Sequence, residues 1–234
     1  MIAARRRTME LMDQPELDPN LHVAALHGLR RINSISRSAA ILWPSIAEAA
    51  SELQPAPLHV LDLACGGGDN ALAISRLARR AGLDVEVSGC DISPVAISEA
   101  RRSAEAYQFE PSNYFQLDVL RQPLPIGFHV ITCSLFLHHL SQEDAVNLVR
   151  KMADATRKLM LISDLRRTWL GLGLAWAGSR LLTRSPIVHT DAVRSVAGAF
   201  VENEIANLTV QHGLDDCVIT THWPQRWLLW WRKH

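Results

Sequence analysis

The sequence predicts an α/β protein built around a doubly wound, seven-stranded and mostly parallel sheet. Between residues 58 and 163, short apolar runs alternate with segments of helical periodicity, which is the pattern of repeated βαβ units. The first apolar run ends in a glycine-rich turn directly before a helical segment, a geometry that holds nucleotide-like ligands. Two further β-prone runs, 218–222 and 226–231, flank Trp223-Pro224 and predict an antiparallel hairpin that completes the sheet.

The first 54 residues are predicted to form a helical cap ahead of an α/β domain that covers residues 55–234. Residues 1–20 are polar and are expected to be poorly ordered. Across residues 21–51, apolar side chains recur at spacings of three and four, which is typical of amphipathic helices. Pro44 is expected to divide this stretch into two helices.

The α/β region contains five predicted parallel strands with helices between them. The strands are predicted over Leu58–Leu63, Val85–Cys90, Tyr114–Leu117, His129–Phe136 and Leu159–Ser163. The helices are predicted over residues 70–81, 94–108, 142–156 and 202–212. Ser93 and Ser141 stand directly before two of these helices and are expected to cap them. Residues 165–199 break the alternation with apolar helical material and are predicted to form an inserted lid.

Composition and charge restrict the function classes. Lys+Arg and Asp+Glu both number 24, so the formal net charge is zero; without a basic excess, no nucleic-acid partner is expected. The four cysteines form no Cys-x-x-Cys pair, so neither a disulfide framework nor a metal site is expected. No signal peptide and no apolar stretch long enough for a bilayer is evident. These features predict a soluble, cytoplasmic protein without stable membrane insertion.

Polar side chains stand where successive predicted strands end. These strand-end residues are Asp62, Asp91, Asp118, Ser134 and Asp164. Because ligands of open α/β sheets bind at the carboxyl ends of the strands, these residues are expected to border one site. Asp91 is placed to accept hydrogen bonds from the two hydroxyls of a ribose. Asp118 is placed to accept one from an adenine amino group, with Ile92 and Val119 flanking the ring.

At this point the sequence resembles the class I S-adenosylmethionine-dependent methyltransferases. The matching segments are Val60–Gly68, Asp91–Ser93, Gln116–Val119 and Ile131–Leu140. The resemblance covers roughly residues 55–234 and implies a Rossmann-like sheet whose seventh strand lies antiparallel between strands five and six. Ala64 departs from the pattern, because it stands where the family usually has its first glycine.

The resemblance implies S-adenosyl-L-methionine as the cofactor. The residues expected to bind it are Asp62, Ala64, Gly66, Gly68, Asn70, Asp91, Ile92, Asp118, Val119 and Ser134. Asp62 and the glycine turn would hold the methionine part and Asp91 the ribose. Asp118 and Val119 would hold the adenine. Among the arginines of the N-terminal helices, Arg37 is the chosen candidate for the cofactor carboxylate.

Two adjacent histidines follow the fourth predicted strand, where the substrate pocket opens in this family. A neutral imidazole suits a general base that removes a proton from an acceptor hydroxyl. His138 is favoured over His139 for this role, and Asp164 at the neighbouring strand end could orient the imidazole. The alternative is that the pair belongs only to the turn after strand four, with one histidine hydrogen-bonded to backbone.

The acceptor is predicted to be small and largely apolar or aromatic, because the lid is apolar. The side chains expected to line that lid are Leu170, Leu172, Leu174, Trp176, Leu181 and Leu182, with Arg166, Arg167 and Arg180 as polar anchors. Methylation of a phenolic hydroxyl, as in quinone and natural-product pathways, is the predicted reaction, and carbon methylation stays open because the same scaffold serves it. Two other functions also stay open. One is a non-catalytic S-adenosylmethionine-binding partner subunit. The other is an NAD-dependent dehydrogenase, because Gly66-x-Gly68-x-x-Ala71 also satisfies the loose dinucleotide fingerprint. The oligomeric state is not predicted.

Overall fold

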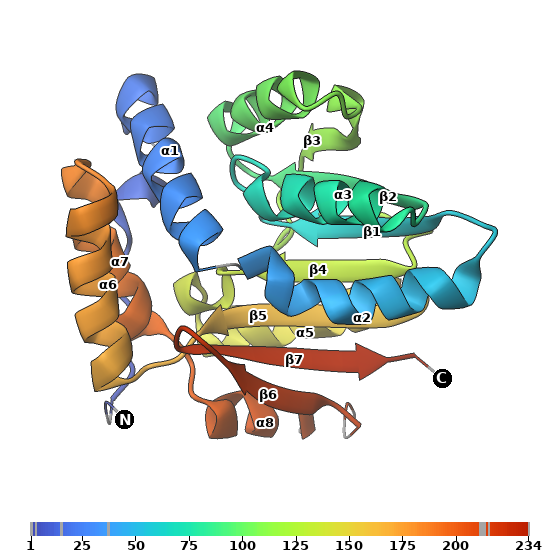
Figure 1. Cartoon of the computed structure of the whole chain (residues 1–234). Helices are drawn as coiled ribbons and strands as arrows, with labels where there is room; N and C mark the ends of the chain where they lie inside the picture. The colour runs from blue at the N-terminus through green and yellow to red at the C-terminus, as the bar shows by residue number, and fades with distance from the viewer. Residues whose placement is uncertain are drawn as a thin grey trace.

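A seven-stranded sheet organises the computed structural model, which describes every residue except 1, 3, 15, 37, 211–213, 215 and 234. Its strands are β1 (Leu58–Leu63), β2 (Val85–Asp91), β3 (Tyr114–Gln116), β4 (Val130–Ser134), β5 (Leu159–Leu165), β6 (Val218–His222) and β7 (Arg226–Arg232). The strand order is β3-β2-β1-β4-β5-β7-β6 (Figure 1). β7 pairs antiparallel with both β5 and β6, and the other neighbours pair parallel. The predicted sheet, including the reversed seventh strand, is confirmed.

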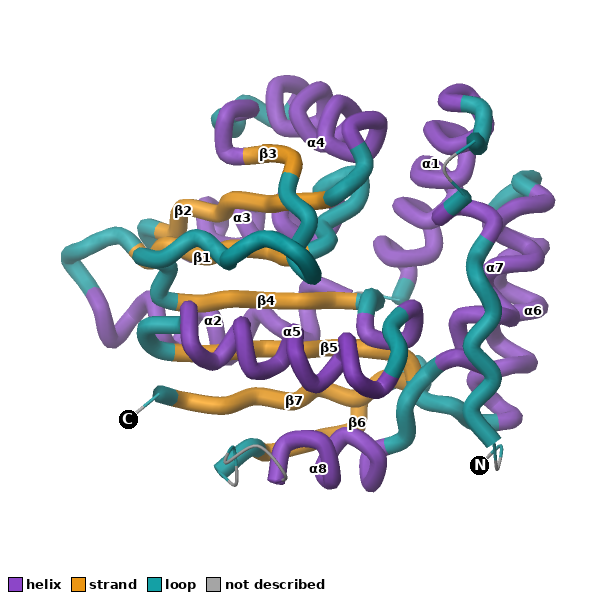
Figure 2. The backbone as a smooth tube through the Cα atoms, turned by 180° about the vertical axis from the view of Figure 1, so that it is seen from behind, coloured by secondary structure: helices purple, strands orange, loops and turns teal. Residues whose placement is uncertain are grey.

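Helices cover both faces of this sheet. They are η1 (Leu11–Asp13), α1 (Pro19–Ile35), α2 (Ser38–Leu53), α3 (Asp69–Ala81), α4 (Pro94–Ala106), η2 (Pro111–Asn113), η3 (Leu137–His139), α5 (Gln142–Ala155), α6 (Trp169–Leu182), α7 (Pro186–Gly198) and α8 (Glu202–Val210). α2, α3 and α4 lie on one face, and α5 and α8 lie on the other (Figures 1 and 2). Among the described helices, none combines the length and the apolar character needed to cross a bilayer.

Two buried apolar clusters, one on each face, hold the layers together. The first joins the α5 and α8 side of the sheet and includes Leu148, Leu208 and Trp227, all buried. The second joins the α2, α3 and α4 side and includes Leu42 and Ile74, both fully buried. Because β1, β4 and β5 are buried on both faces, they read as continuous apolar runs, as expected for parallel strands between two helix layers.

The ends of several elements follow the capping residues. The Ser93 hydroxyl accepts from the Ala96 amide at 3.2 Å, and the Ser141 hydroxyl accepts from the Asp144 amide at 3.0 Å, so both predicted caps are confirmed. The fourth strand is shorter than predicted, because Leu135 takes a left-handed φ of 57° and the chain then turns into η3. The described part of α8 ends at Val210, and the rest of the predicted 202–212 helix lies outside the described residues.

Pro44 does not separate the two N-terminal helices, and that prediction is wrong. The break falls between Ile35 and Ser38, and Pro44 lies inside α2. An interior proline removes one helix hydrogen bond and costs about 3 kcal/mol or more. Burial of Leu42 and Ile46, both fully buried against the sheet, offsets this cost, since most helix stability in proteins comes from packing.

The carboxyl ends of the parallel strands are capped by α1, α6, α7 and the N-terminal segment (Figures 1 and 2). The Arg5 guanidinium donates to the carbonyls of Gly198 at 2.6 Å and Leu140 at 2.7 Å. Its pKa is lowered to about 10 by burial. The expectation that residues 1–20 lack defined structure is therefore wrong for the described part of that segment. The proposed domain boundary after residue 54 stays a prediction.

Candidate functional site

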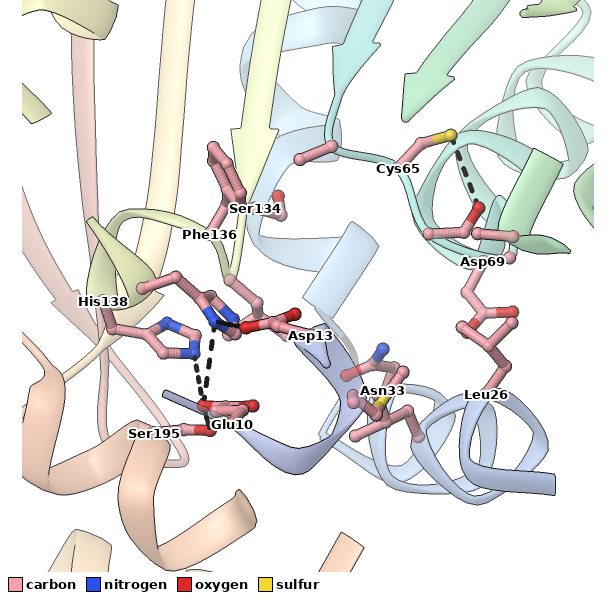
Figure 3. Close-up of a pocket in the computed structure, with 18 of the residues that line it drawn as sticks. Glu10, Asp13, Leu26, Asn33, Cys65, Asp69, Ser134, Phe136, His138 and Ser195 are labelled. Carbon is pink, nitrogen blue, oxygen red and sulfur yellow. Dashed lines mark hydrogen bonds and ion pairs between the residues drawn. The ribbon is translucent and has the colours of Figure 1, made fainter. Parts of the chain in front are cut away.

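A cavity of about 860 Å³ lies between the strand ends and the capping helices (Figure 3). Most of the predicted site residues line it, namely Asp62, Ala64, Gly66, Asn70, Asp91, Ile92, Asp118, Val119, Ser134, His138 and His139. Gly68 and Asp164 are not among the lining residues, and Arg37 lies outside the described residues. The structure thus brings both the candidate cofactor residues and the candidate histidines to a single cavity.

The glycine turn owes its shape to left-handed backbone. Gly66 has a φ of 53° and Gly68 a φ of 78°, a region that glycine enters without penalty. A Cβ on Gly68 would lie 3.0 Å from the Tyr114 ring and 3.1 Å from the Ala100 Cβ. Gly68 therefore lets α3 start close to α4, whereas Gly66 exposes its backbone to the cavity. Ala64 also has a positive φ, 51°, which explains why the family usually has glycine there.

Asp91 connects the turn to the end of β2. Its Oδ2 accepts from the Gly66 amide and its Oδ1 from the Ser93 amide, each at 2.9 Å. Burial raises the pKa of Asp91, and these two hydrogen bonds partly oppose the shift. Each carboxylate oxygen has a second lone pair, so Asp91 can also accept from a ligand in the cavity.

Asp62 and Ser134 lie deeper, at the ends of β1 and β4. Asp62 is buried and its Oδ1 accepts from the Thr132 hydroxyl at 2.7 Å. Burial raises the pKa of Asp62 to about 7. Within the described residues, the buried Ser134 hydroxyl has no hydrogen-bond partner. A buried polar group without a partner is costly, so this hydroxyl is suited to a polar group of a ligand.

Asp118 lines the adenine end of the predicted site but is partly engaged. Its Oδ1 accepts from the amides of Leu120 at 3.0 Å and Arg121 at 3.1 Å, which closes the turn after β3. Ile92 also lines the cavity and is 60% exposed. An exposed apolar side chain beside an acceptor suits the flat face and amino edge of a purine.

Arg30 of α1 contacts the start of α3, directly after the glycine turn. The Arg30 Nε donates to Asp69 and its Nη2 to the Ser103 hydroxyl, both at 2.7 Å. These contacts tie α1 to the start of α3. Burial raises the pKa of Asp69, and the Arg30 hydrogen bond opposes that shift.

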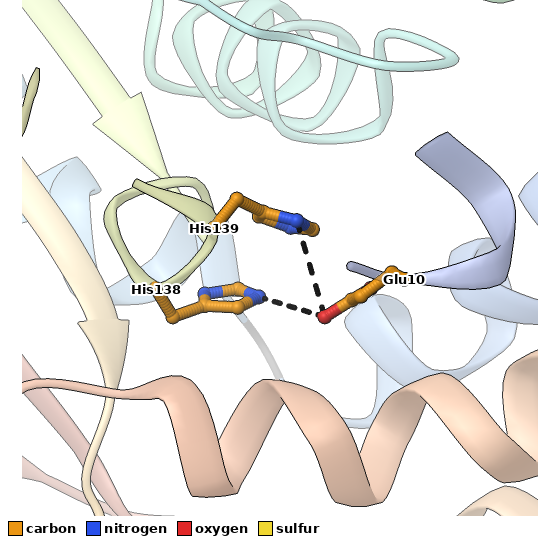
Figure 4. A group of neighbouring side chains, drawn as sticks. All are labelled: Glu10, His138 and His139. Carbon is orange, nitrogen blue, oxygen red and sulfur yellow. Dashed lines mark ion pairs between the residues drawn. The ribbon is translucent and has the colours of Figure 1, made fainter. Parts of the chain in front are cut away.

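His138 lies between two carboxylates. Its Nδ1 is 2.7 Å from Asp164 Oδ1, its backbone amide donates to Asp164 Oδ2 at 3.0 Å, and its Nε2 is 3.5 Å from Glu10 Oε1. The side chain is only 4% exposed. η3 presents His138 and His139 side by side, and the N-terminal segment brings Glu10 up to them (Figure 4).

The charges around His138 decide its protonation. Burial alone would lower the pKa of the imidazole, but the charge and hydrogen bond of Asp164, joined by Glu10, raise it to about 10. Burial alone would raise the pKa of Asp164 and of Glu10. The charge and hydrogen bonds of the His138 imidazolium instead hold both pKa values below the usual range. In this arrangement His138 is an imidazolium at neutral pH, held by two anions.

His139 differs from its neighbour in exposure and partners. Its Nδ1 lies 2.9 Å from Asp13 Oδ2 and 3.9 Å from Glu10 Oε1. The two histidine rings lie 4.2 Å apart between centroids. Glu10, His138 and His139 each offer one ligand atom, all within 4.8 Å of one another, so these three could hold a metal ion. The sequence-based expectation of no metal site stays a prediction.

Sequence reasoning missed the acids that complete this cluster. Glu10 is 7% exposed and also accepts from the Ser195 hydroxyl of α7 at 2.5 Å, and Asp13 lines the same cavity. An isolated acid in a polar N-terminal segment carries no periodicity and no motif. No signal in the sequence places it beside a histidine 128 positions further on.

The lid has one face on the cavity and one on solvent. Of the six apolar side chains predicted to line the cavity, the structure places only Leu174 there, next to Gly171, Ala175 and Gly178 of the same helix. Trp176 and Leu181 are exposed instead. Arg166 and Arg167 pair with Glu202 and Glu204 of α8, so both anchor the lid to the protein and neither lines the cavity.

Sequence comparison matches residues 60–158 to the methyltransferase domain family. Curated relatives include the demethylmenaquinone methyltransferases of Thermus thermophilus, 37% identical over 112 residues (47% of this chain, 49% of that protein), and of Deinococcus radiodurans, 36% identical over 89 residues (38% and 35%). The matched segment thus spans about half the length of the first relative and a third of the second.

Solved structures share the fold over most of the chain. Magnesium protoporphyrin IX methyltransferase from Synechocystis PCC 6803, with bound S-adenosylhomocysteine, aligns with a TM-score of 0.56 at 16% identity, covering 95% of this chain and 91% of that one. An O-methyltransferase from neocarzinostatin biosynthesis, in complex with S-adenosyl-L-homocysteine and 1,4-dihydroxy-2-naphthoic acid, aligns with a TM-score of 0.60 at 17% identity, covering 92% and 58%. At this identity the likeness shows the fold.

Proposed function

We propose that the protein is a class I S-adenosylmethionine-dependent methyltransferase that methylates a hydroxyl of a small, largely apolar or aromatic acceptor. Residues 60–158 match a methyltransferase domain family. S-adenosylmethionine is the cofactor of this domain class. The observation that carries the proposal is the shared cavity: Gly66 and Asp91 line it on one side, and His138 and Leu174 on the other.

The residues of the cavity fit the cofactor. Gly66 lines the cavity without a side chain, Asp91 keeps free lone pairs at the end of β2, and the Ser134 hydroxyl is unpartnered among the described residues. When bound, S-adenosylmethionine supplies an electrophilic methyl group on a sulfonium. The chain's own residues then have to position the acceptor, exclude water and remove a proton.

His138 is the proposed proton acceptor, with Asp164 as its orienting partner. The 2.7 Å contact to Nδ1 leaves Nε2 as the atom that reaches the cavity side. Glu10 occupies that side at 3.5 Å and keeps the imidazole protonated. We therefore place the acceptor hydroxyl at Nε2, in the position that Glu10 occupies in its absence. Displacement of the Glu10 anion lowers the imidazole pKa, and the neutral Nε2 can then take the proton of the acceptor.

A phenolic acceptor suits this site in size and chemistry. A phenol has a pKa near 10, so an imidazole held by Asp164 can take its proton in the transition state. The apolar cavity wall from α6 suits a ring. The O-methyltransferase solved in complex with 1,4-dihydroxy-2-naphthoic acid, a hydroxylated aromatic compound, has the same fold.

Calorimetric titration with S-adenosylmethionine, S-adenosylhomocysteine and NADH tests the cofactor, and a panel of phenols and naphthols tests turnover. We expect both adenosyl ligands to bind, NADH not to bind, and S-adenosylhomocysteine to form with at least one phenol. Binding without turnover on any hydroxylated or carbon acceptor would favour the non-catalytic partner subunit. Preference for NADH would refute the proposal.

A further inference from the structure

The solvent face of α6 is apolar along its whole length. Trp169 is 68% exposed, Trp176 is 55% exposed and Leu181 is 84% exposed. At 3.6 residues per turn, positions 169, 173, 176 and 180 fall on one line and positions 170, 177 and 181 lie beside it. Six of these seven residues are apolar or glycine, the exception being Arg180. We call these seven residues the α6 outer face.

This surface is unusual for a protein exposed to water alone. Exposed apolar residues scattered singly need no explanation, but a contiguous apolar patch marks an interaction site. α6 lies at the edge of the molecule, outside α7 and away from the sheet, in both views (Figures 1 and 2). Nothing in the fold of the described residues requires this face to be apolar.

The charged side chains of the chain segment that carries α6 have one sign. Residues 165–190 contain four arginines and no aspartate or glutamate. Arg166 and Arg167 are used in ion pairs with α8, whereas Arg180 and Arg184 are exposed at the end of α6. The Arg180 guanidinium stacks on the Trp176 ring at 4.6 Å and also donates to the Trp176 carbonyl. The Arg180 charge therefore lies on the outer face itself, beside Trp176.

We propose that α6 docks the protein on an anionic membrane surface, with the outer face lying in the interface between headgroups and acyl chains. Interfacial helices combine tryptophan and leucine on one face with arginine or lysine as the charged component. Arginines near an anionic leaflet add to this attraction. With 14 residues, α6 is too short to span a bilayer and is suited to lie along its surface.

The opposite side of the same helix supports this placement. Gly171, Leu174 and Gly178 of α6 line the cavity, so α6 is the wall between the cavity and the surface that would face lipid. An apolar acceptor dissolved in the bilayer would then meet the lid directly. This step rests on the proposed function, whereas membrane docking itself does not.

Sedimentation with sucrose-loaded vesicles tests the docking without cofactor or acceptor. The probes are vesicles of phosphatidylcholine alone and of phosphatidylcholine with phosphatidylglycerol at a ratio of about three to one. We expect the protein to sediment with the mixed vesicles and about ten-fold less with the neutral ones. The double variant W176E/L181E should bind the mixed vesicles about 100-fold less well.

Ile126→Glu is the matched control, because Ile126 is 85% exposed, almost the same as Leu181, and lies in the loop before β4. It should sediment as the unmodified protein does. All variants should keep their affinity for S-adenosylhomocysteine, which shows that they are folded.

Three results would overturn the docking. They are no sedimentation of the unmodified protein, equal loss in Ile126→Glu, and a stable dimer in solution that W176E/L181E dissociates, since a second copy would then cover the face. Vesicle binding without any methyl transfer would leave the docking intact and refute the proposed function. Methyl transfer without vesicle binding would refute the docking and leave the proposed function intact.

Discussion

The two sides of the cavity are built in different ways. The cofactor side comes from strand ends and turns that are compact in sequence, and its main hydrogen bonds join Asp91 to Gly66 and Ser93. The acceptor side comes from three distant segments, since Glu10 meets His138 and also Ser195, 185 positions away. A side built from local backbone geometry keeps its shape in any fold of this kind. A side built from separate segments can change the residues of one segment without the others. Acceptor specificity can therefore differ between proteins of this fold through changes on that side.

The largest expected effect is on the acceptor side. His138→Ala should lower kcat by about 10²- to 10⁴-fold, the usual contribution of a general base. The affinity for S-adenosylhomocysteine should stay within about two-fold, because the described partners of the His138 ring are Asp164 and Glu10 and not the residues of the cofactor side. Steady-state kinetics and calorimetry measure the two quantities. His139→Ala is the matched control, with a smaller loss expected. Unchanged turnover in His138→Ala would remove the histidine from the mechanism.

Asp91→Asn should weaken cofactor binding, the quantity that His138→Ala is expected to leave nearly unchanged. Losing the charged acceptor weakens hydrogen bonds that are each worth about 1.5–3 kcal/mol, so we expect about 100-fold weaker binding of S-adenosylhomocysteine. The binding measurement is calorimetric. Glu86→Gln on the same strand is the control, because Glu86 is exposed and pairs with His59 away from the cavity. Equal affinity of Asp91→Asn and Glu86→Gln for S-adenosylhomocysteine would mean that Asp91 only shapes the turn.

Glu10→Gln should change the pH dependence of turnover by about one pH unit or more. The imidazole accepts a proton only when it is neutral, so activity limited by His138 falls as the pH drops below the pKa of about 10. Removing the Glu10 charge lowers that pKa, so the rising limb should move to lower pH and turnover at neutral pH should increase. The pH profile of kcat/KM measures this shift. An unmoved profile would contradict the exchange of Glu10 for the acceptor.

The smallest effect should come from the backbone of the cofactor side. Ala64 has a φ of 51°, where a Cβ costs about 1–2 kcal/mol. Ala64→Gly relieves this strain and adds chain entropy to the unfolded state, so the net gain in the free energy of unfolding should be about 0.5–1 kcal/mol. Urea denaturation measures it. Destabilisation would show that the Ala64 methyl makes packing contacts that outweigh the strain.

The accuracy of the sequence-based predictions also differs between features built from local segments and features built from distant ones. The βαβ alternation and the caps at Ser93 and Ser141 follow from local patterns, and the place of the antiparallel β7 was implied by the family resemblance. All of these are confirmed. Gly66 and Asp91 were identifiable because a glycine turn and a strand-end acid are themselves local signals. Their roles toward the cofactor stay predictions.

The failures all involve contacts between distant segments. Periodicity shows that α6 is helical, but with apolar residues on every side it does not show which side faces the cavity, so Trp176 and Leu181 were misplaced. Pro44 reads as a helix breaker unless the burial around it is known. Glu10 has no local signal, because its position follows from where the N-terminal segment finally packs.

The contacts of the N-terminal segment also set the order in which the molecule can be assembled. Arg5 bonds the Gly198 carbonyl across 193 positions, and Arg226 bonds the Ser36 hydroxyl across 190. During synthesis, which proceeds at about 5–20 residues per second, the first ten residues have no binding surface until α7 has been translated. The sheet from β1 to β5 can pair before that time. Closure of the cavity over His138 is therefore among the last steps of folding, and contacts of such long range are the slowest to form.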